Sequence, residues 1–161
     1  LCFIPDTVKE YLEERTQEAP GPIVDAADDH KVIGEHRGVQ FYTIGQKRGL
    51  GLFHSHLDRY VIDLRAQDNT VVVGTREMCR WSRLSARRVN FLCEDDEVPE
   101  RVFAQVRYRQ EPVPATFLRT GEDGFELQFD EPLFAVTGGQ SPVLYDGDRL
   151  LGGGVIEART R

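Results

Sequence analysis

The sequence has few of the residues that build disulfide-bonded or membrane-spanning proteins. Of its 161 residues only three are cysteines, and no two of them form a Cys-x-x-Cys pair. An odd number of unpaired cysteines argues against a disulfide framework and predicts a reducing, cytoplasmic setting. No run approaches the roughly 18 apolar residues that a membrane helix needs, so we expect no membrane partner.

Several enzyme motifs are also missing. No Gly-Lys-Ser or Gly-Lys-Thr triplet occurs, and Gly49-Leu50-Gly51 lacks the third glycine of a dinucleotide loop. No serine stands at a recognisable nucleophile elbow. His54, His56 and Asp58 lie close together, but a structural zinc site needs four ligands, and we therefore expect no metal site. These residues alone do not describe a complete enzyme.

The chain is acidic, with 27 acidic and 20 basic residues and a net charge of −7. This charge opposes non-specific binding to nucleic acid, because attraction to phosphate depends on cations. The charges are segregated, however. Five arginines fall between residues 76 and 88, and an acidic turn follows at 94–97. A local basic patch is therefore compatible with the negative chain.

Residues 34–51 combine many glycines with apolar, β-prone side chains, and we call them the glycine-rich segment. Its glycines are Gly34, Gly38, Gly45, Gly49 and Gly51. Each glycine permits a backbone turn that other residues resist, and the two aromatics between them indicate burial. We interpret the segment as a rigid platform between two modules, with a helical turn near residues 39–44. Contact of Arg37, Lys47 and Arg48 with RNA backbone is a further hypothesis.

The first half of the chain predicts a small α+β domain. The expected elements are a helix from Asp6 to Ala19, a hairpin over 22–25 and 31–35, a second hairpin over 60–64 and 70–73, and a short helix over 75–79. Residues 80–83 are expected to form a linker. The first domain would cover residues 1–79 and include the remnant of a preceding catalytic domain.

From Leu84 onward the pattern is β throughout. The six expected strands cover 89–93, 102–109, 115–119, 125–130, 143–146 and 150–156. So few short strands favour a closed barrel, because closure removes exposed edges, and a sandwich is the alternative. Gly152-Gly153-Gly154 inside the last strand predicts a bulge or a close backbone approach. The fold class is thus mainly β: a small α+β domain followed by a six-stranded antiparallel β-barrel over residues 80–161.

Three places offer candidate chemistry. Cys2 lies among apolar residues, which favours a packed structural thiol over a nucleophile, and Cys79 and Cys93 have no partner motif. Arg107-Tyr108-Arg109 could hold phosphates and stack on a base, or could form a strand with exposed arginines and an inward tyrosine. Gln140 follows a glycine pair that could approach a ligand or form a plain turn.

Several stretches together resemble the central and C-terminal domains of the bacterial tRNA-specific 2-thiouridylases (MnmA family). The strongest matches are His36-Arg37-Gly38 with residues 45–51, and Asp146-Gly147-Asp148 with residues 152–156. Leu-Cys-Phe-Ile-Pro at residues 1–5, Arg107–Gln110 and the loop ending at Gln140 also match, in the same order. The family usually has proline at the position of Gly139, and residues 53–59 depart from its usual run.

The resemblance implies a function for these residues. The family replaces O2 of the wobble uridine of tRNA with sulfur, after an ATP-binding domain that is not in this sequence adenylates that oxygen. The position of Cys2 carries the persulfide, which a sulfur-donor protein supplies, and this reverses the structural interpretation of Cys2. The positions of Arg107, Tyr108 and Gln140 contact tRNA, and we add the neighbouring Arg109. No cofactor is expected on this chain, which should be inactive alone.

Two other classes of function are compatible with the residues. One is a non-catalytic RNA-binding β-barrel of the translation-factor type, which would use Arg107, Tyr108 and the arginines between 80 and 88. The other is a protein-interaction module without any role in RNA binding.

Overall fold

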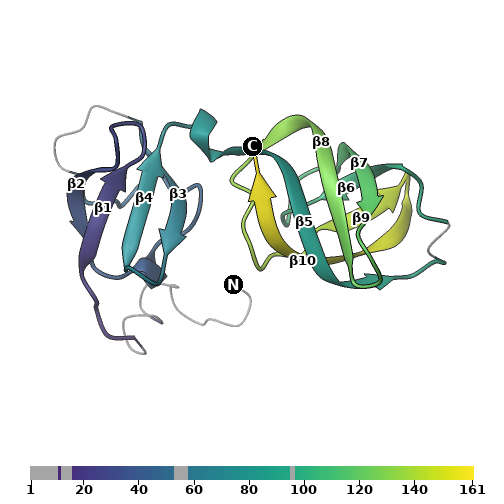
Figure 1. The fold of residues 1–161 in the computed structure, drawn as a ribbon, viewed down its shortest axis with the longest axis horizontal. Coiled ribbons are helices and arrows are strands. Elements are labelled where there is room, and N and C mark those ends of the chain that lie inside the picture. Colours follow the sequence, from purple (N-terminus) through teal and green to yellow (C-terminus); the bar gives the residue numbers. More distant parts are fainter. Residues whose placement is uncertain (1–10, 12–15, 53–57, 95–96) are drawn as a thin grey trace. The chain divides into compact units, whose positions relative to one another are not determined.

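The chain divides into two compact units, Leu1–Cys79 and Arg80–Arg161. The computed structural model describes residues 11, 16–52, 58–94 and 97–161 (Figure 1). Within these ranges no helix is long and apolar enough to cross a membrane.

The first unit contains a four-stranded sheet in the order β2-β1-β4-β3. Its strands are β1 (Gly21–Asp25), β2 (Lys31–His36), β3 (Tyr60–Arg65) and β4 (Thr70–Gly74). The pairs β1–β2 and β3–β4 are antiparallel hairpins, as the sequence predicted, and β1 runs parallel to β4. Every residue of β4 is buried, because its β-branched run Val71-Val72-Val73 lies in the middle of the sheet.

The glycine-rich segment leaves β2 and packs against β3. It forms one short 3₁₀ turn, η1 (Val39–Phe41), where the sequence predicted a helical turn. Its backbone then pairs with β3, since Gly45 N–H donates to Val61 O and Val61 N–H donates to Gln46 O. Four of its five glycines have positive φ, which explains the glycine content of a segment that is otherwise apolar.

Two predictions for this half of the chain are wrong. The helix was expected to reach Ala19, but residues 17–20 are not helical and Ala19 N–H donates to Arg37 O. Residues 80–83 are not a linker. They begin β5 (Arg80–Phe91), directly after the short 3₁₀ helix η2 (Glu77–Cys79), and Trp81 pairs with Leu133 of β8.

The second unit is a closed barrel of six strands in the order β10-β5-β8-β7-β6-β9 (Figure 1). The remaining strands are β6 (Arg101–Gln105), β7 (Val113–Arg119), β8 (Gly124–Phe134), β9 (Val143–Asp146) and β10 (Arg149–Thr160). Every pair in the barrel is antiparallel. The prediction of a mainly β fold with a six-stranded antiparallel barrel is therefore confirmed.

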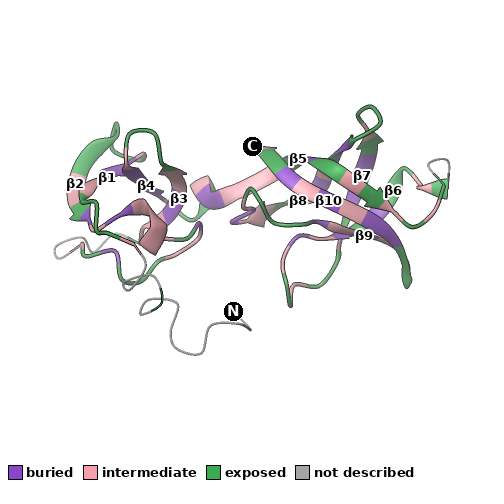
Figure 2. Ribbon diagram, turned by 90° about the horizontal axis from the view of Figure 1, so that it is seen from below, coloured by how far each residue is buried: buried purple, intermediate pink, exposed green. Residues whose placement is uncertain are grey.

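The barrel core follows the period of two that strands impose on their side chains. Alternate residues point inward, for example Leu84 and Ala86 of β5 and Phe125, Leu127 and Phe129 of β8. Figure 2 shows these buried positions interleaved with exposed ones along the strands. Because the cluster of buried side chains consists only of residues from the second unit, the barrel has a core of its own.

The triple glycine in β10 marks a close backbone approach, as predicted. A Cβ atom on Gly152 would lie 2.4 Å from Asn90 O, and one on Gly153 would lie 2.3 Å from Pro142 O. The pairing of β10 with β5 also shifts register between Gly153 and Val155. Only glycine fits this strand where its neighbours crowd against it.

Candidate nucleic-acid interface

The two loops that carry the predicted tRNA contacts leave the barrel at the same end. Strand β6 ends at Gln105, which pairs with Val143, the first residue of β9. The start of the loop after β6 (residues 106–112) therefore lies beside the end of the loop before β9 (residues 135–142). Arg107, Tyr108 and Arg109 lie on the first loop and Gln140 on the second.

Arg107 joins the two loops rather than presenting its charge to solvent. Its guanidinium donates to the backbone oxygen of Ala135 and, at 3.5 Å, to the hydroxyl oxygen of Thr137. The Thr137 hydroxyl in turn donates to Ala135 O at 3.1 Å. Arg107 is thus a positioning residue in this structure. Thr137 is a second one, and nothing in the sequence singled it out.

Tyr108 lies on the loop and not in a strand. The strand expected over 102–109 is too long, because β6 ends at Gln105. Of the two alternatives for Tyr108, the inward-facing side chain is wrong, because Tyr108 is 89% exposed. The side chain of Gln105 closes the turn by donating to Gln110 O. The Arg109 guanidinium lies 5.3 Å from the centre of the Tyr108 ring. An exposed ring beside a cation is the arrangement that binds a base and its phosphate.

Gln140 has a fixed backbone and an exposed side chain. Its carbonyl accepts the Ile156 N–H at 2.8 Å, and the N–H of Gly139 donates to Ile156 O at 2.8 Å. Gly139 has a φ of 81°. Proline has neither this φ nor an N–H, so the conformation of this loop requires a residue other than proline.

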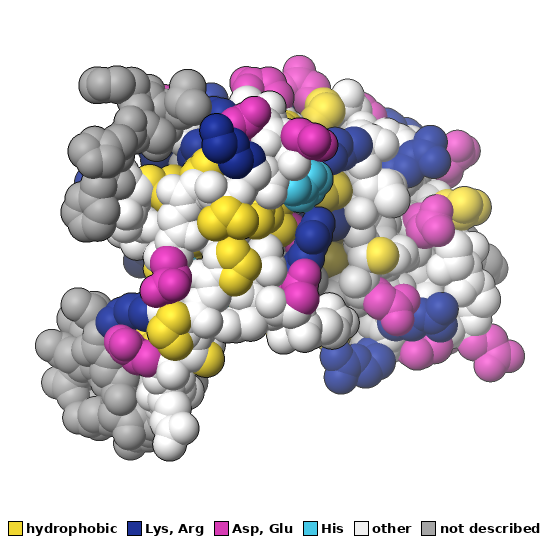
Figure 3. Space-filling view, turned by 60° about the vertical axis from the view of Figure 1, so that its left-hand side comes forward, with side chains coloured by type: hydrophobic (Ala, Val, Ile, Leu, Met, Phe, Trp, Pro, Cys, Tyr) yellow, Lys and Arg dark blue, Asp and Glu magenta, His cyan; other side chains and the backbone are white. Residues whose placement is uncertain are grey.

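Two of the three cations of the glycine-rich segment have partners within the chain. Arg37 lies 4.1 Å above the Phe41 ring and 3.8 Å from a Glu18 oxygen. Lys47 forms an ion pair with Asp58 at 2.9 Å, and the hydrogen bond and charge of Asp58 raise the pKa of Lys47. Figure 3 shows basic and acidic side chains interspersed on the face that it displays.

The arginines between residues 80 and 88 are mostly engaged as well. Arg80 donates to Pro132 O, Arg83 to the Gln128 side chain, and Arg87 to Glu157 at 2.6 Å. Glu157 also raises the pKa of Arg87, by its hydrogen bond and its charge. Consequently these three side chains do not form the open basic patch that their spacing suggested.

Cys2, His54 and His56 lie outside the described residues. Cys79 is buried and its thiol contacts Val61 O, while the half-buried Cys93 contacts Leu151 O. Both thiols pack as structural groups. In the part of the chain that the structure describes, no three His, Cys, Asp or Glu side chains gather as metal ligands.

Comparison with known protein families assigns this chain to a class of proteins. Residues 9–75 match the family model described as a tRNA methyl transferase PRC-barrel domain, and residues 81–156 match an aminomethyltransferase beta-barrel domain. The chain is therefore a protein that combines these two β domains, the second of which coincides with the closed barrel.

Relatives narrow the class to one family. A protein named tRNA-specific 2-thiouridylase MnmA from Deinococcus radiodurans is 48% identical over all of this chain and 42% of its own length. Its namesake from Thermus thermophilus is 46% identical over 97% of the chain and 41% of its own length. The chain belongs to the tRNA-specific 2-thiouridylase (MnmA) family, as the sequence motifs indicated. It spans about two fifths of the length of these relatives.

Proposed function

We propose that the chain is part of a cytoplasmic tRNA sulfurtransferase that 2-thiolates the wobble uridine, and that its barrel positions the tRNA. The observation that carries this proposal is the pair of loops at one end of the barrel. Tyr108 and Arg109 stand exposed on one loop, and Arg107 ties that loop to the one that carries Gln140. Stacking by Tyr108, phosphate binding by Arg109 and hydrogen bonding by Gln140 suit an unpaired stretch of RNA.

We assign the sulfur chemistry to Cys2. In this proposal a sulfur-donor protein loads Cys2 as a persulfide, and the terminal sulfur bonds to C2 of the uridine as the activated oxygen leaves. The thiol of a second cysteine, outside this chain, then displaces the thiolated base by forming a disulfide with Cys2. ATP supplies the activation of the oxygen. No phosphate-binding loop occurs in these 161 residues, so we assign ATP binding to another part of the longer protein.

Binding of a tRNA transcript to the chain tests the role of the loops. We expect Tyr108→Ala to weaken binding about tenfold, because stacking of one base contributes about 1–3 kcal/mol. The free energy of unfolding should not change, since the ring is 89% exposed. Fluorescence anisotropy at fixed salt measures the affinity of the variant and of the wild type for the transcript. Phe103→Ala is the control, because Phe103 is an exposed aromatic (45%) that lies within strand β6 and not on either loop. Equal affinities of Tyr108→Ala and wild type would contradict the proposal.

Mass spectrometry tests the role of Cys2. After incubation with a small-molecule persulfide donor, we expect one additional sulfur atom on the peptide that contains Cys2 and none on the peptides of Cys79 and Cys93. Cys2→Ser should accept no sulfur, and in the full-length protein it should abolish 2-thiouridine formation. Thiolated tRNA from the Cys2→Ser protein would remove Cys2 from the mechanism.

A further inference from the structure

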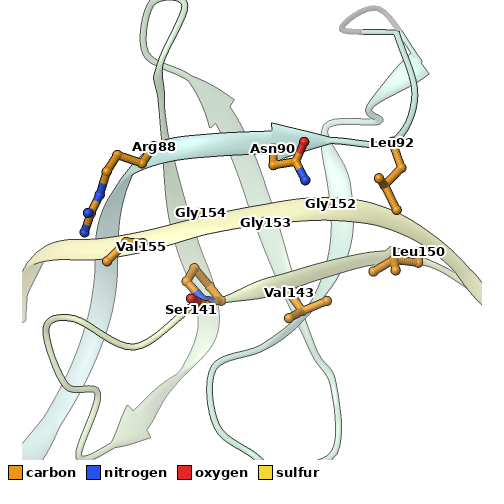
Figure 4. A pocket seen from close by; sticks show the side chains of 11 residues that line it. Arg88, Asn90, Leu92, Ser141, Val143, Leu150, Gly152, Gly153, Gly154 and Val155 are labelled. Carbon is orange, nitrogen blue, oxygen red and sulfur yellow. The ribbon is translucent and has the colours of Figure 1, made fainter.

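A groove of about 340 Å³ runs along β10 on the outside of the barrel, between β5 and β9 (Figure 4). Gly152, Gly153 and Gly154 form its floor. Arg88, Asn90 and Leu92 of the β5 side line one wall, and Ser141, Val143 and Leu150 line the other. Small-molecule sites in proteins have volumes of about 300–1,000 Å³, so the volume of this groove suits one small ligand.

The groove exists because β10 has no side chain where its neighbours have theirs. Gly153 pairs with Asn90 on one side and with Val143 on the other. The close approach of Pro142 O excludes a Cβ at Gly153, so this part of β10 has no side chain on its outer surface and the Pro142 carbonyl lies against it. The side chains of β5 and β9 rise on both sides of this flat floor, as Figure 4 shows.

The two ends of the groove differ in chemistry. Leu92 and Leu150, which are 64% and 43% exposed, border one end (Figure 4). Arg88 and Val155 border the other end. The two exposed leucines offer apolar side chains against which a flat ring can pack. Between the ends, the Asn90 amide and the Ser141 hydroxyl can donate and accept hydrogen bonds.

Arg88 faces the groove because of a bulge in β5. Two residues of β5, Arg88 and Val89, stand opposite the single residue Gly154. Arg87 and Arg88 are therefore both exposed, although they are consecutive in a strand. Arg87 pairs with Glu157, whereas in the described part of the chain no carboxylate forms an ion pair with Arg88. No Asp or Glu lines the groove, in a chain with a net charge of −7.

We propose that this groove binds one unpaired nucleotide of the tRNA, a contact separate from those of Tyr108 and Gln140. The base lies on the glycine floor between Leu92 and Leu150, Asn90 and Ser141 hydrogen-bond its edge, and Arg88 binds its phosphate. Ser141 directly follows Gln140, so the groove continues the proposed tRNA surface. The inference rests on the proposed function. An acidic peptide would also pair with Arg88, and the experiments below distinguish it from a nucleotide.

Nuclear magnetic resonance of the isotope-labelled chain tests the groove by itself. We expect AMP to shift the amide resonances of Gly152, Gly153 and Gly154, with smaller shifts from adenosine or from inorganic phosphate. Arg88→Ala should remove most of the AMP response. Arg87→Ala is the matched control, because it deletes the same charge from the next residue but outside the groove.

Three results would overturn the inference. Equal shifts from phosphate and AMP would show an anion site only. Stronger shifts from a hexaglutamate peptide would show a peptide site. Equal losses in Arg87→Ala and Arg88→Ala would show general electrostatic attraction.

Binding of a tRNA transcript separates this inference from the proposed function. Arg88→Ala should weaken binding three- to tenfold and make the negative slope of log K against log salt shallower by about 0.7, the value for one phosphate contact in a single strand. Leu92→Ser should weaken binding, whereas Leu118→Ser, similarly exposed at 60% on β7, should not. If Tyr108→Ala alone weakens binding, the proposed function stands and the groove inference falls. If only Arg88→Ala and Leu92→Ser weaken it, the groove stands and the Tyr108 assignment falls.

Discussion

His36 connects the glycine-rich segment to the sheet through both nitrogens of its ring. The side chain is almost fully buried, at 2% exposure. The Gly38 N–H donates to Nδ1 at 2.9 Å, so the proton of the neutral ring is on Nε2, which donates to Asn69 O at 2.9 Å. The ring also meets Tyr42 edge-on, with 5.7 Å between the centroids. His36 therefore fixes the turn at Gly38 against the β3–β4 hairpin.

Replacing His36 should destabilise the first unit. We expect His36→Ala to lower the free energy of unfolding by about 2–4 kcal/mol, because a buried N–H and a partly buried carbonyl each lose their partner at about 1–3 kcal/mol. Urea denaturation followed by circular dichroism measures the change. His30→Asn is the control, since His30 is exposed with a φ of 56°, a conformation that asparagine tolerates. A loss no larger than that of the control would contradict this role.

Residue identity alone did not reveal the burial of His36 or the exposure of Tyr108. The sequence marks His36 only as part of a family motif, because burial of a single histidine leaves no periodic signal. Tyr108 continued an alternation with Val102, Ala104 and Val106, and these three residues are buried as that pattern requires. The alternation shows on which face of a strand a residue lies, but it does not show where the strand ends. Here the Gln105–Gln110 hydrogen bond closes a turn around Tyr108.

At the scale of elements, β10 is the strand whose sequence is most tightly constrained by its neighbours. It pairs with β5 on one side and β9 on the other, and its pairing shifts register with both. The local twist that such bulges introduce brings Pro142 O and Asn90 O against the glycines. A side chain at these positions would push two strands apart and open the barrel.

Gly153→Ala tests this crowding. We expect a loss of about 1–3 kcal/mol in the free energy of unfolding, because a Cβ 2.3 Å from Pro142 O forces the backbone to shift. Gly138→Ala is the matched control. Its Cβ would meet nothing closer than 3.8 Å, and a compatible alanine changes stability by about 0.4–1 kcal/mol in the favourable direction. Thermal unfolding compares the two. Similar midpoints for both variants would show that the close approach is not essential.

At the scale of the whole molecule, the two units have separate cores. The barrel core consists only of residues from β5 onward, whereas the buried residues of the first unit centre on β1 and β4. The only tryptophan, Trp81, is in β5 and belongs to the barrel. Its fluorescence therefore reports unfolding of the second unit alone, whereas circular dichroism reports unfolding of both units.

This separation predicts which transition each variant moves. Gly153→Ala should lower the urea midpoint that Trp81 fluorescence reports. His36→Ala should leave that midpoint unchanged and lower only the midpoint of the circular dichroism transition that belongs to the first unit. Parallel denaturation curves with the two probes measure this. A His36→Ala variant that shifts the Trp81 midpoint as far as Gly153→Ala does would show that the units unfold as one.

The sequence by itself determined most of the elements and the family. Period-two alternation, turn residues and glycine clusters predicted both hairpins, the barrel and the close approach at Gly153, because these depend on local backbone geometry and on which face is buried. Only the tertiary structure decided that β5 begins at Arg80, that Tyr108 is exposed, and that Arg107 positions a loop instead of meeting solvent. Those outcomes depend on partners distant in the sequence, such as Leu133 for Trp81 and Ala135 for Arg107, which local patterns do not encode.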